Sequence, residues 1–309
     1  MGNMTQCRVN GKEINRLGGI EHLMGILSAL INEYVYLPPI YENKEDPIES
    51  EVELELQLEL ELELELVNVT LGALRDLACG NAPNRIQIGQ YKHPSSDSTT
   101  SSTSSTSQTS TTSGIEIISY FIKRHAHQTW KDISKMELRS MTNALGVVRN
   151  ITHSTPVNCQ GLHEVGMTTV FINTLRSSND EDEDDNSTKT TRTLPDVSKP
   201  WREACFRLAA SLINMAEKCH DAVQECAKDE ELIWLLIESW GGMKDGKAIP
   251  VLHLGLMAVL VERLKMGKDG AGTSIELLNM IHVIIEREEK RKRAAQEREN
   301  ARKKIKEIQ

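Results

Sequence analysis

The stretch Asn10–Leu27 reads NGKEINRLGGIEHLMGIL, and its pattern recurs further along the chain. A second full copy spans Asn158–Thr174 and reads NCQGLHEVGMTTVFINT, with an apolar residue four positions after the Asn and a glycine at the same corner. A third copy is divided, because NRIQI begins at Asn84 and GIEIISYFI begins at Gly114, with a Ser/Thr-rich stretch between them. Each copy predicts a short helix, a glycine turn and a second helix with apolar residues at helical spacing.

A second motif precedes the two later copies and then occurs once more. It reads ALRDL at 73–77, VVRNI at 147–151 and SLINM at 211–215. Its Asn150 and Asn214 are 64 residues apart, and the interval is about 41 once the polar block at about 177–199 is subtracted. Asn10 and Asn84 are 74 residues apart, which becomes about 45 in the same way. Both intervals fall within the roughly 40–47-residue period of stacked helical repeats.

Three blocks interrupt the pattern: a Glu-Leu-rich block at about 43–66, a Ser/Thr-rich block at about 94–113 and an acidic, polar block at about 177–199. We expect them to be disordered insertions between helices that stay out of the hydrophobic core, because extra loop length costs little free energy. The Glu-Leu block alternates with the period of a strand, yet both residue types favour helix. A frayed helix leading into Val69–Ala78 is therefore the prediction there.

The segments Ala73–Ile86 and Thr142–Thr152 resemble the third helix and following turn of armadillo repeats, with similarity to the β-catenin and δ-catenin groups. This resemblance implies an all-α fold, a right-handed armadillo-type α-solenoid of about three to four repeats over residues 1–264. A single repeat cannot bury its own apolar faces, so neighbouring repeats stack around one continuous core.

Residues 265–309 predict a long C-terminal helix that starts at a capping box over Thr273–Glu276. From Glu286 onward it contains ten Lys/Arg and six Asp/Glu, so its end is basic and mixed in charge. The run Lys290–Arg293 has the alternative interpretation of a nuclear-import signal. The whole chain has a net charge of −9, which argues against a general nucleic-acid-binding domain.

No arrangement of residues supports catalysis, a cofactor or a metal, so we expect a protein that is not an enzyme. Cys219, His220 and Cys226 lack the second pair of ligands that a zinc site needs. His125 and His127 would point to different sides of a helix. Without a secretory signal or a membrane-length apolar run, the expected location is the cytoplasm or the nucleus, with no membrane insertion.

The armadillo resemblance also implies a function, because third helices in that family line a groove that binds an extended segment of another protein. The Asn near the end of the third helix commonly contacts the main chain of that segment; the alternative is that it caps its own helix. The candidate groove residues are Arg75, Asp76, Arg149, Asn150, Arg207 and Asn214.

The leading hypothesis is a non-enzymatic scaffold or adaptor whose partner is another protein rather than a small-molecule substrate. Importin-α-like receptors carry Trp one turn before the groove Asn, whereas this chain has Gly146 and Ala210, which argues against binding of nuclear signals. One alternative is an armadillo-type nucleotide-exchange factor for a heat-shock chaperone. A second is nuclear nucleic-acid association through the basic tail.

Overall fold

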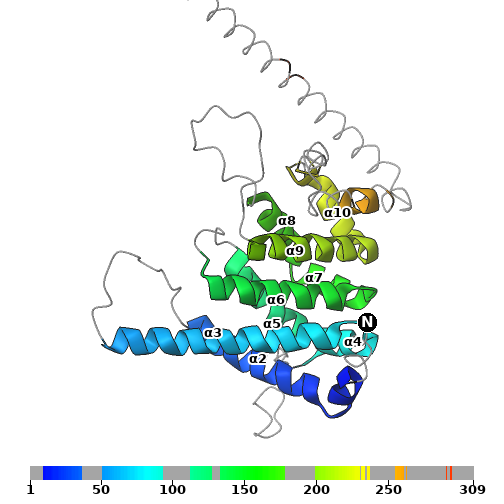
Figure 1. Ribbon diagram of the computed structural model, residues 1–309. Coiled ribbons are helices and arrows are strands. Elements are labelled where there is room, and N and C mark those ends of the chain that lie inside the picture. Colours follow the sequence, from blue (N-terminus) through cyan, green and yellow to red (C-terminus); the bar gives the residue numbers. More distant parts are fainter. Residues whose placement is uncertain are drawn as a thin grey trace, which may run out of the picture. The chain divides into compact units, whose positions relative to one another are not determined.

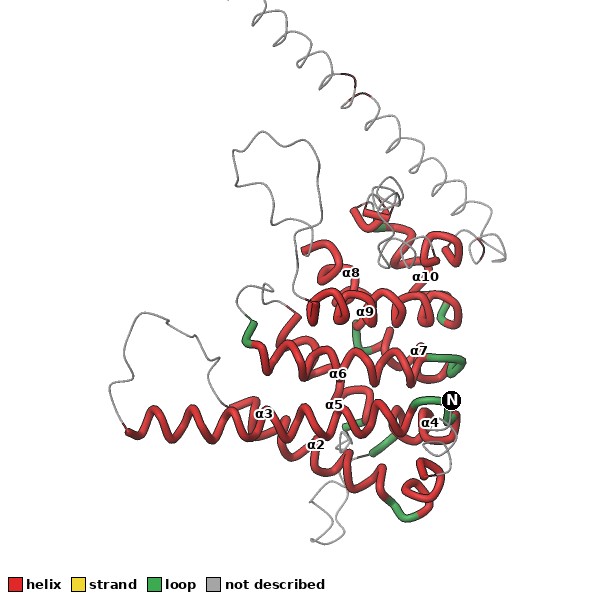
Figure 2. Tube along the Cα trace, viewed as in Figure 1, coloured by secondary structure: helices red, strands yellow, loops and turns green. Residues whose placement is uncertain are grey.

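A computed structural model describes residues 10–36, 51–92, 112–126, 133–177, 199–229, 231–233, 235–236, 255–260, 262, 290 and 293. Within these residues all regular structure is helical, as predicted, apart from one isolated bridge between Lys92 and Ser113 (Figure 2). Contacts between residues divide the chain into two units, 1–222 and 223–309. The predicted groove residues all belong to the first unit.

Helices of three lengths alternate along the first unit. A short helix at 10–16 precedes the others. The named helices are α2 (Gly19–Tyr36), α3 (Glu51–Ala78), α4 (Ala82–Gln90), α5 (Gly114–Ala126), α6 (Lys135–Thr152), α7 (Pro156–Glu164), α8 (Met167–Ser177) and α9 (Lys199–Lys218). Helix α10 (His220–Lys228) begins in the first unit, and most of its residues belong to the second. The order of short, middle and long helix therefore occurs three times, ending at α3, α6 and α9.

The long helices α3, α6 and α9 lie side by side in one layer, with α6 packed against both of the others (Figure 1). Each also packs against the middle helix of its own triplet, α2, α5 or α8. The hydrophobic core lies between these helices. Four of its residues are 0% exposed: Leu74, Leu145, Phe171 and Leu212. Apolar residues at three- and four-residue spacing place one continuous stripe of each helix in this core.

Glycines turn the chain between short and middle helices, as the recurring pattern predicts. Gly18 and Gly166 have φ values of 76° and 78°, in the left-handed region that side-chain-bearing residues rarely adopt. In the divided copy, Lys92 pairs with Ser113, and the Gly114 N–H donates to the Tyr91 carbonyl at 2.8 Å. The chain therefore leaves and re-enters the helical unit at adjacent points, so the stretch 93–111 is accommodated without separating α4 from α5.

Local capping sets where the next helices begin. The Ser134 hydroxyl accepts the Glu137 N–H at 3.2 Å, and the Glu137 carboxylate accepts the Ser134 N–H at 2.9 Å, so a complete capping box starts α6. Pro156 occupies the first turn of α7, where the missing N–H costs nothing. The first signal sets the start of the long helix of the second triplet, and the second sets the start of the third triplet.

A buried asparagine joins each triplet to the one before it. Asn84 and Asn158 are 0% exposed, and the side-chain amide of each donates at 2.9 Å to the carbonyl seven residues earlier, at the end of the preceding long helix. Each also donates to a carbonyl in the preceding short helix, Gly11 at 3.3 Å for Asn84 and Arg85 at 2.9 Å for Asn158. The same pair of contacts thus recurs at an interval of 74 residues.

The Glu-Leu block does contribute to the core, which corrects the expectation for 43–66. Helix α3 begins at Glu51 and runs through the block without a break, so the prediction of helix is confirmed there. Leu60 and Leu64 are only 7% and 2% exposed. Winding the alternating sequence as a helix spreads its leucines around the axis, so some of them meet the core while Leu62 points to solvent. Residues 43–50 lie outside the described part.

Other expectations also lie outside the described residues. They concern most of the Ser/Thr-rich block, at 93–111, and most of the acidic block, at 178–198. In the predicted C-terminal helix of 265–309, only Lys290 and Arg293 are described, and both are helical.

Replacing Leu212 by Ala should lower the free energy of unfolding by ~2–5 kcal/mol, because its side chain is fully buried in α9. The matched control is Leu62→Ala in α3, since Leu62 is 63% exposed and its loss should change stability by less than about 0.5 kcal/mol. Chemical denaturation followed by circular dichroism measures both. Equal effects of the two changes would contradict the assigned helix faces.

Replacing Asn158 by Ala should lower the free energy of unfolding by about 1–3 kcal/mol, because the buried Ile151 carbonyl and the partly buried Arg85 carbonyl lose their side-chain donor. Asn10 holds the equivalent motif position in the first copy but is exposed, so Asn10→Ala should be close to neutral. Thermal and urea unfolding of the two variants provide the comparison. A neutral Asn158→Ala would show that the amide does not join the triplets.

Candidate partner-binding face

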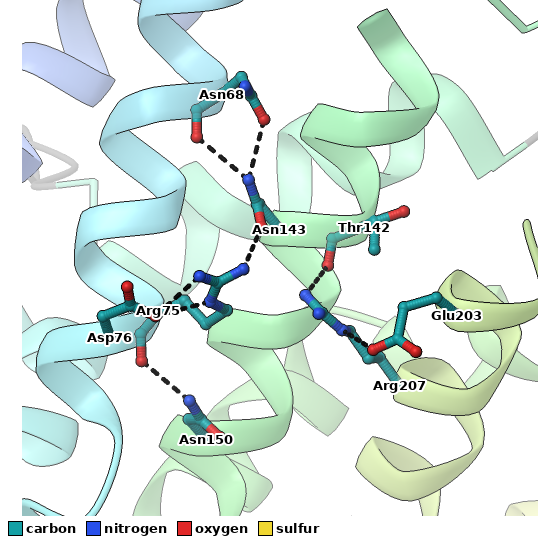
Figure 3. A network of polar contacts seen from close by, with 8 residues as sticks. All are labelled: Asn68, Arg75, Asp76, Thr142, Asn143, Asn150, Glu203 and Arg207. Carbon is teal, nitrogen blue, oxygen red and sulfur yellow. Dashed lines mark hydrogen bonds and ion pairs between the residues drawn. The ribbon is translucent and has the colours of Figure 1, made fainter. Parts of the chain in front are cut away.

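The six residues predicted for a binding groove all lie on the layer of long helices. Arg75 and Asp76 are on α3, Arg149 and Asn150 are on α6, and Arg207 and Asn214 are on α9. Figure 3 shows most of them in a network of polar contacts that crosses from helix to helix. The sequence motif therefore identified one shared region of the first unit.

The two motif asparagines connect neighbouring long helices. The Asn150 amide donates to the Arg75 carbonyl at 2.8 Å, and the Asn214 amide donates to the Arg149 carbonyl at 3.0 Å. In both cases the acceptor is on the preceding long helix, one residue before the position that matches the asparagine in the motif: Arg75 precedes Asp76, and Arg149 precedes Asn150. This arrangement differs from capping of the asparagine's own helix, which was the alternative considered for both residues.

A second row of contacts joins the same three helices two helical turns closer to their N-terminal ends. The Asn143 amide donates to the Asn68 side-chain oxygen at 2.8 Å and to the Asn68 carbonyl at 3.3 Å. Arg207 donates through Nη1 to the Thr142 carbonyl at 2.8 Å (Figure 3). We call the two rows together the ladder; its side chains are Asn68, Arg75, Asn143, Asn150, Arg207 and Asn214.

Sequence reasoning missed Asn68 and Asn143. A signal for them was present, because each of the three long helices carries its two ladder residues seven positions apart: 68 and 75, 143 and 150, 207 and 214. Seven residues correspond to nearly two helical turns, so both members of each pair lie on one face. The spacing could have been found by extending the motif two turns toward the N-terminus of each helix.

Gly146 lets two arginines from different helices converge above α6. A Cβ atom at this position would lie 2.6 Å from Arg207 Nη1 and 2.8 Å from Arg75 Cδ, closer than such atoms can approach. The absence of a side chain at Gly146 therefore provides the space that both arginine side chains occupy. Two positive charges from α3 and α9 meet at the site where the importin-like pattern would place an aromatic ring.

Both arginines have acidic partners that are more exposed than they are. Arg75 Nε donates to Asp76 Oδ1 at 2.8 Å, and Arg207 Nε donates to Glu203 Oε1 at 2.8 Å. The side chains of Arg75 and Arg207 are 30% and 16% exposed, against 71% for Asp76 and 48% for Glu203. The guanidinium groups are therefore more enclosed than their carboxylate partners, which face solvent.

Arg75 is also fixed from the side of α6, because its Nη1 donates to Asn143 Oδ1 at 2.6 Å. Arg149 lies elsewhere on the layer. Its guanidinium carbon is 5.3 Å from the centre of the Phe206 ring, which is the geometry of a cation–π contact. Arg149 therefore joins α6 to α9 and does not take part in the cluster at Gly146.

The residues considered for metal binding have structural contacts. Among the described residues, no three His, Cys, Asp or Glu side chains gather as they would around a metal ion. Cys219 and Cys226 are buried, and the Cys219 thiol lies 3.2 Å from Gln160 Oε1. Buried His125 packs on the Phe121 ring, 4.7 Å between centres, and lies 3.8 Å from the Glu137 carboxylate. His127 is outside the described part.

Two further cysteines have the character of packing residues. Burial raises the pKa of Cys205 and of Cys159 to about 12, so both thiols stay protonated near neutral pH. A protonated, buried thiol is a poor nucleophile and a small apolar group. In the part of the chain that the structure describes, no helix has the length and apolarity required to cross a bilayer.

Replacing both Asn150 and Asn214 by Ala should lower the free energy of unfolding by about 1–3 kcal/mol, since each removes an inter-helix hydrogen bond. Asp76→Ala is the matched control, because Asp76 holds the same motif position on α3 but is 71% exposed. Its effect should be less than about 0.5 kcal/mol. Denaturant titration that finds the double variant as stable as Asp76→Ala would contradict the ladder.

Comparison of this chain with protein-family models, with curated proteins and with solved structures found no significant match.

Proposed function

We propose that the chain is an armadillo-type α-solenoid that acts as a non-enzymatic scaffold and binds an extended segment of a partner protein along the ladder. Three features support the repeat assignment: the threefold order of short, middle and long helices, the glycine turns, and the recurring contacts of Asn84 and Asn158. The layer of α3, α6 and α9 supplies a surface to which each triplet contributes equivalent positions.

An extended main chain suits the spacing of this surface. Packed helices lie roughly 8–10 Å apart, and an extended chain advances about 3.3 Å per residue, so successive helices meet the segment about every third residue. The amide of Asn150 uses one N–H for the Arg75 carbonyl. Its second N–H and its carbonyl oxygen match the acceptor and donor of one peptide unit. One asparagine can therefore hold the neighbouring helix and a bound segment together.

The cluster at Gly146 carries the proposal further, because it defines a chemical preference. Arg75 and Arg207 approach the same space from opposite sides and are fixed by Asn143 and Thr142 respectively. Guanidinium groups held in this way bind carboxylates through paired, charge-assisted hydrogen bonds. A carboxylate on the partner segment would replace the exposed Asp76 and Glu203 as the counter-ion. We therefore propose that the segment carries an acidic side chain at this point.

The test begins with the full-length chain, cross-linked in cell lysate and analysed by mass spectrometry to identify the partner segment in contact with α3, α6 and α9. A synthetic peptide of that segment is then titrated against the wild-type protein and against Arg75→Glu with Arg207→Glu. Binding should weaken at least about tenfold in the double variant, because attraction to the acidic side chain becomes repulsion.

The matched control is Arg16→Glu, since Arg16 is exposed and lies outside the ladder. It should leave affinity unchanged while changing the net charge in the same direction. Circular dichroism establishes that each variant is folded. Peptides that cross-link only to other surfaces, or equal affinity for the reversed and wild-type proteins, would reject the proposed site.

A further inference from the structure

Helix α3 carries an apolar stripe on the side that faces away from the core. Leu58, Leu62, Leu66 and Val69 are 57%, 63%, 47% and 58% exposed. Their spacing of four, four and three residues places them within about 80° of one another around the helix axis. Leu71, which is fully buried, lies on the opposite side of the same helix. Among the described residues, all four therefore keep roughly half or more of their surface open to solvent.

The stripe lies partly on a length of α3 that extends past its neighbour. The Asn143–Asn68 and Asn150–Arg75 contacts align α6 with α3 at an offset of 75 residues. The first residue of α6 is Lys135, so everything before Leu60 on α3 lies beyond the start of α6 (Figure 1). Single exposed leucines are ordinary, but an aligned row of four marks a contact surface. Its spacing is the one that packed helix pairs use.

Acidic side chains border the stripe on both sides. Glu59 and Glu61 are exposed, and Glu65 is partly exposed beside Asn68. At 100° per residue, Glu59 lies on one edge of the stripe while Glu61 and Glu65 lie on the other. The stretch from Glu51 to Leu74 contains no Lys or Arg. Whatever covers the stripe therefore meets negative charge along both of its edges.

We propose that this stripe is a docking site for an amphipathic helix of a partner protein, with aliphatic residues at three- and four-residue spacing and Lys or Arg on both flanks. The charge pattern selects this occupant. Two copies of α3 pairing with each other would place Glu against Glu along both edges. An anionic membrane surface would be repelled for the same reason. A basic-flanked helix buries the leucines and pairs with Glu59, Glu61 and Glu65.

The apolar stripe is distinct from the ladder, which it meets only where Glu65 accepts a hydrogen bond from Asn68 at 3.2 Å, and the proposal does not depend on the proposed function. Its residues lie on the solvent side of α3, whereas Asn68 and Arg75 face α6. A partner helix on the stripe and an extended segment on the ladder would therefore use different side chains of the same helix.

The test uses full-length protein and two synthetic helical peptides with an identical leucine row, one with Lys on both flanks and one with Glu. Fluorescence anisotropy should show the Lys peptide binding at least about tenfold more tightly. Leu62→Gln with Leu66→Gln should weaken that binding about tenfold or more, because the apolar contact is lost. Leu17→Gln is the matched control, since Leu17 is 65% exposed and outside the stripe. It should bind as the wild type does.

A charge exchange provides the second measurement. Glu59→Lys with Glu61→Lys should reduce binding of the Lys peptide and increase binding of the Glu peptide. Circular dichroism verifies that the exposed substitutions leave the helix content unchanged. The proposal is overturned if both peptides bind equally, or if Leu62→Gln with Leu66→Gln binds like Leu17→Gln. Two other results would also overturn the proposal. One is a dimer, seen by sedimentation, that Leu62→Gln with Leu66→Gln abolishes. The other is binding to phosphatidylserine vesicles, seen by flotation, that the same double variant abolishes.

Discussion

The arrangement of the first unit depends on side-chain amides that donate to main-chain carbonyls of the preceding helix. Asn150 and Asn214 do this between long helices, and Asn84 and Asn158 do it between triplets. Apolar packing supplies most of the stabilising free energy, but it is non-directional and tolerates sliding of one helix along another. A hydrogen bond to one particular carbonyl does not tolerate sliding. The amides therefore fix the register in which the apolar stripes meet, and with it the positions of every ladder residue.

That division of roles explains what the sequence could predict. The glycines at 18 and 166 and the asparagines at 84 and 158 recur because each pair meets the same requirement in two triplets, a left-handed turn or a pair of main-chain carbonyls that need a donor. Requirements of this kind leave the same residue at the same position. The predicted groove residues came from the same recurrence, so the structure places them on one layer; their role in binding a partner stays a prediction.

Features that arise between helices were harder to predict. Gly146 reads as an ordinary helix residue until Arg75 and Arg207 are known to occupy the space above it. The Glu-Leu block has no helical periodicity, so nothing in it separates the buried Leu64 from the exposed Leu62. The distinction comes from α6, whose Ser140 hydroxyl lies against the Leu64 carbonyl at 3.4 Å. Single-sequence patterns describe one helix at a time, whereas these residues acquire their roles from a neighbour that is about 75 positions away.

Helix α3 illustrates how such pairing creates two chemically different surfaces on one element. Where α6 covers it, Asn68 and Arg75 have fixed partners, and positive charge is held over Gly146. On the face of α3 that is turned away from the core and from α6, leucines remain exposed between glutamates. A chain of net charge −9 would be expected to repel acidic ligands, yet the arginine cluster is local and partly desolvated, so it acts at short range. The acidic stripe has the opposite preference. Under the two proposals, the surfaces would select ligands of opposite charge, which would keep a partner of one site from occupying the other.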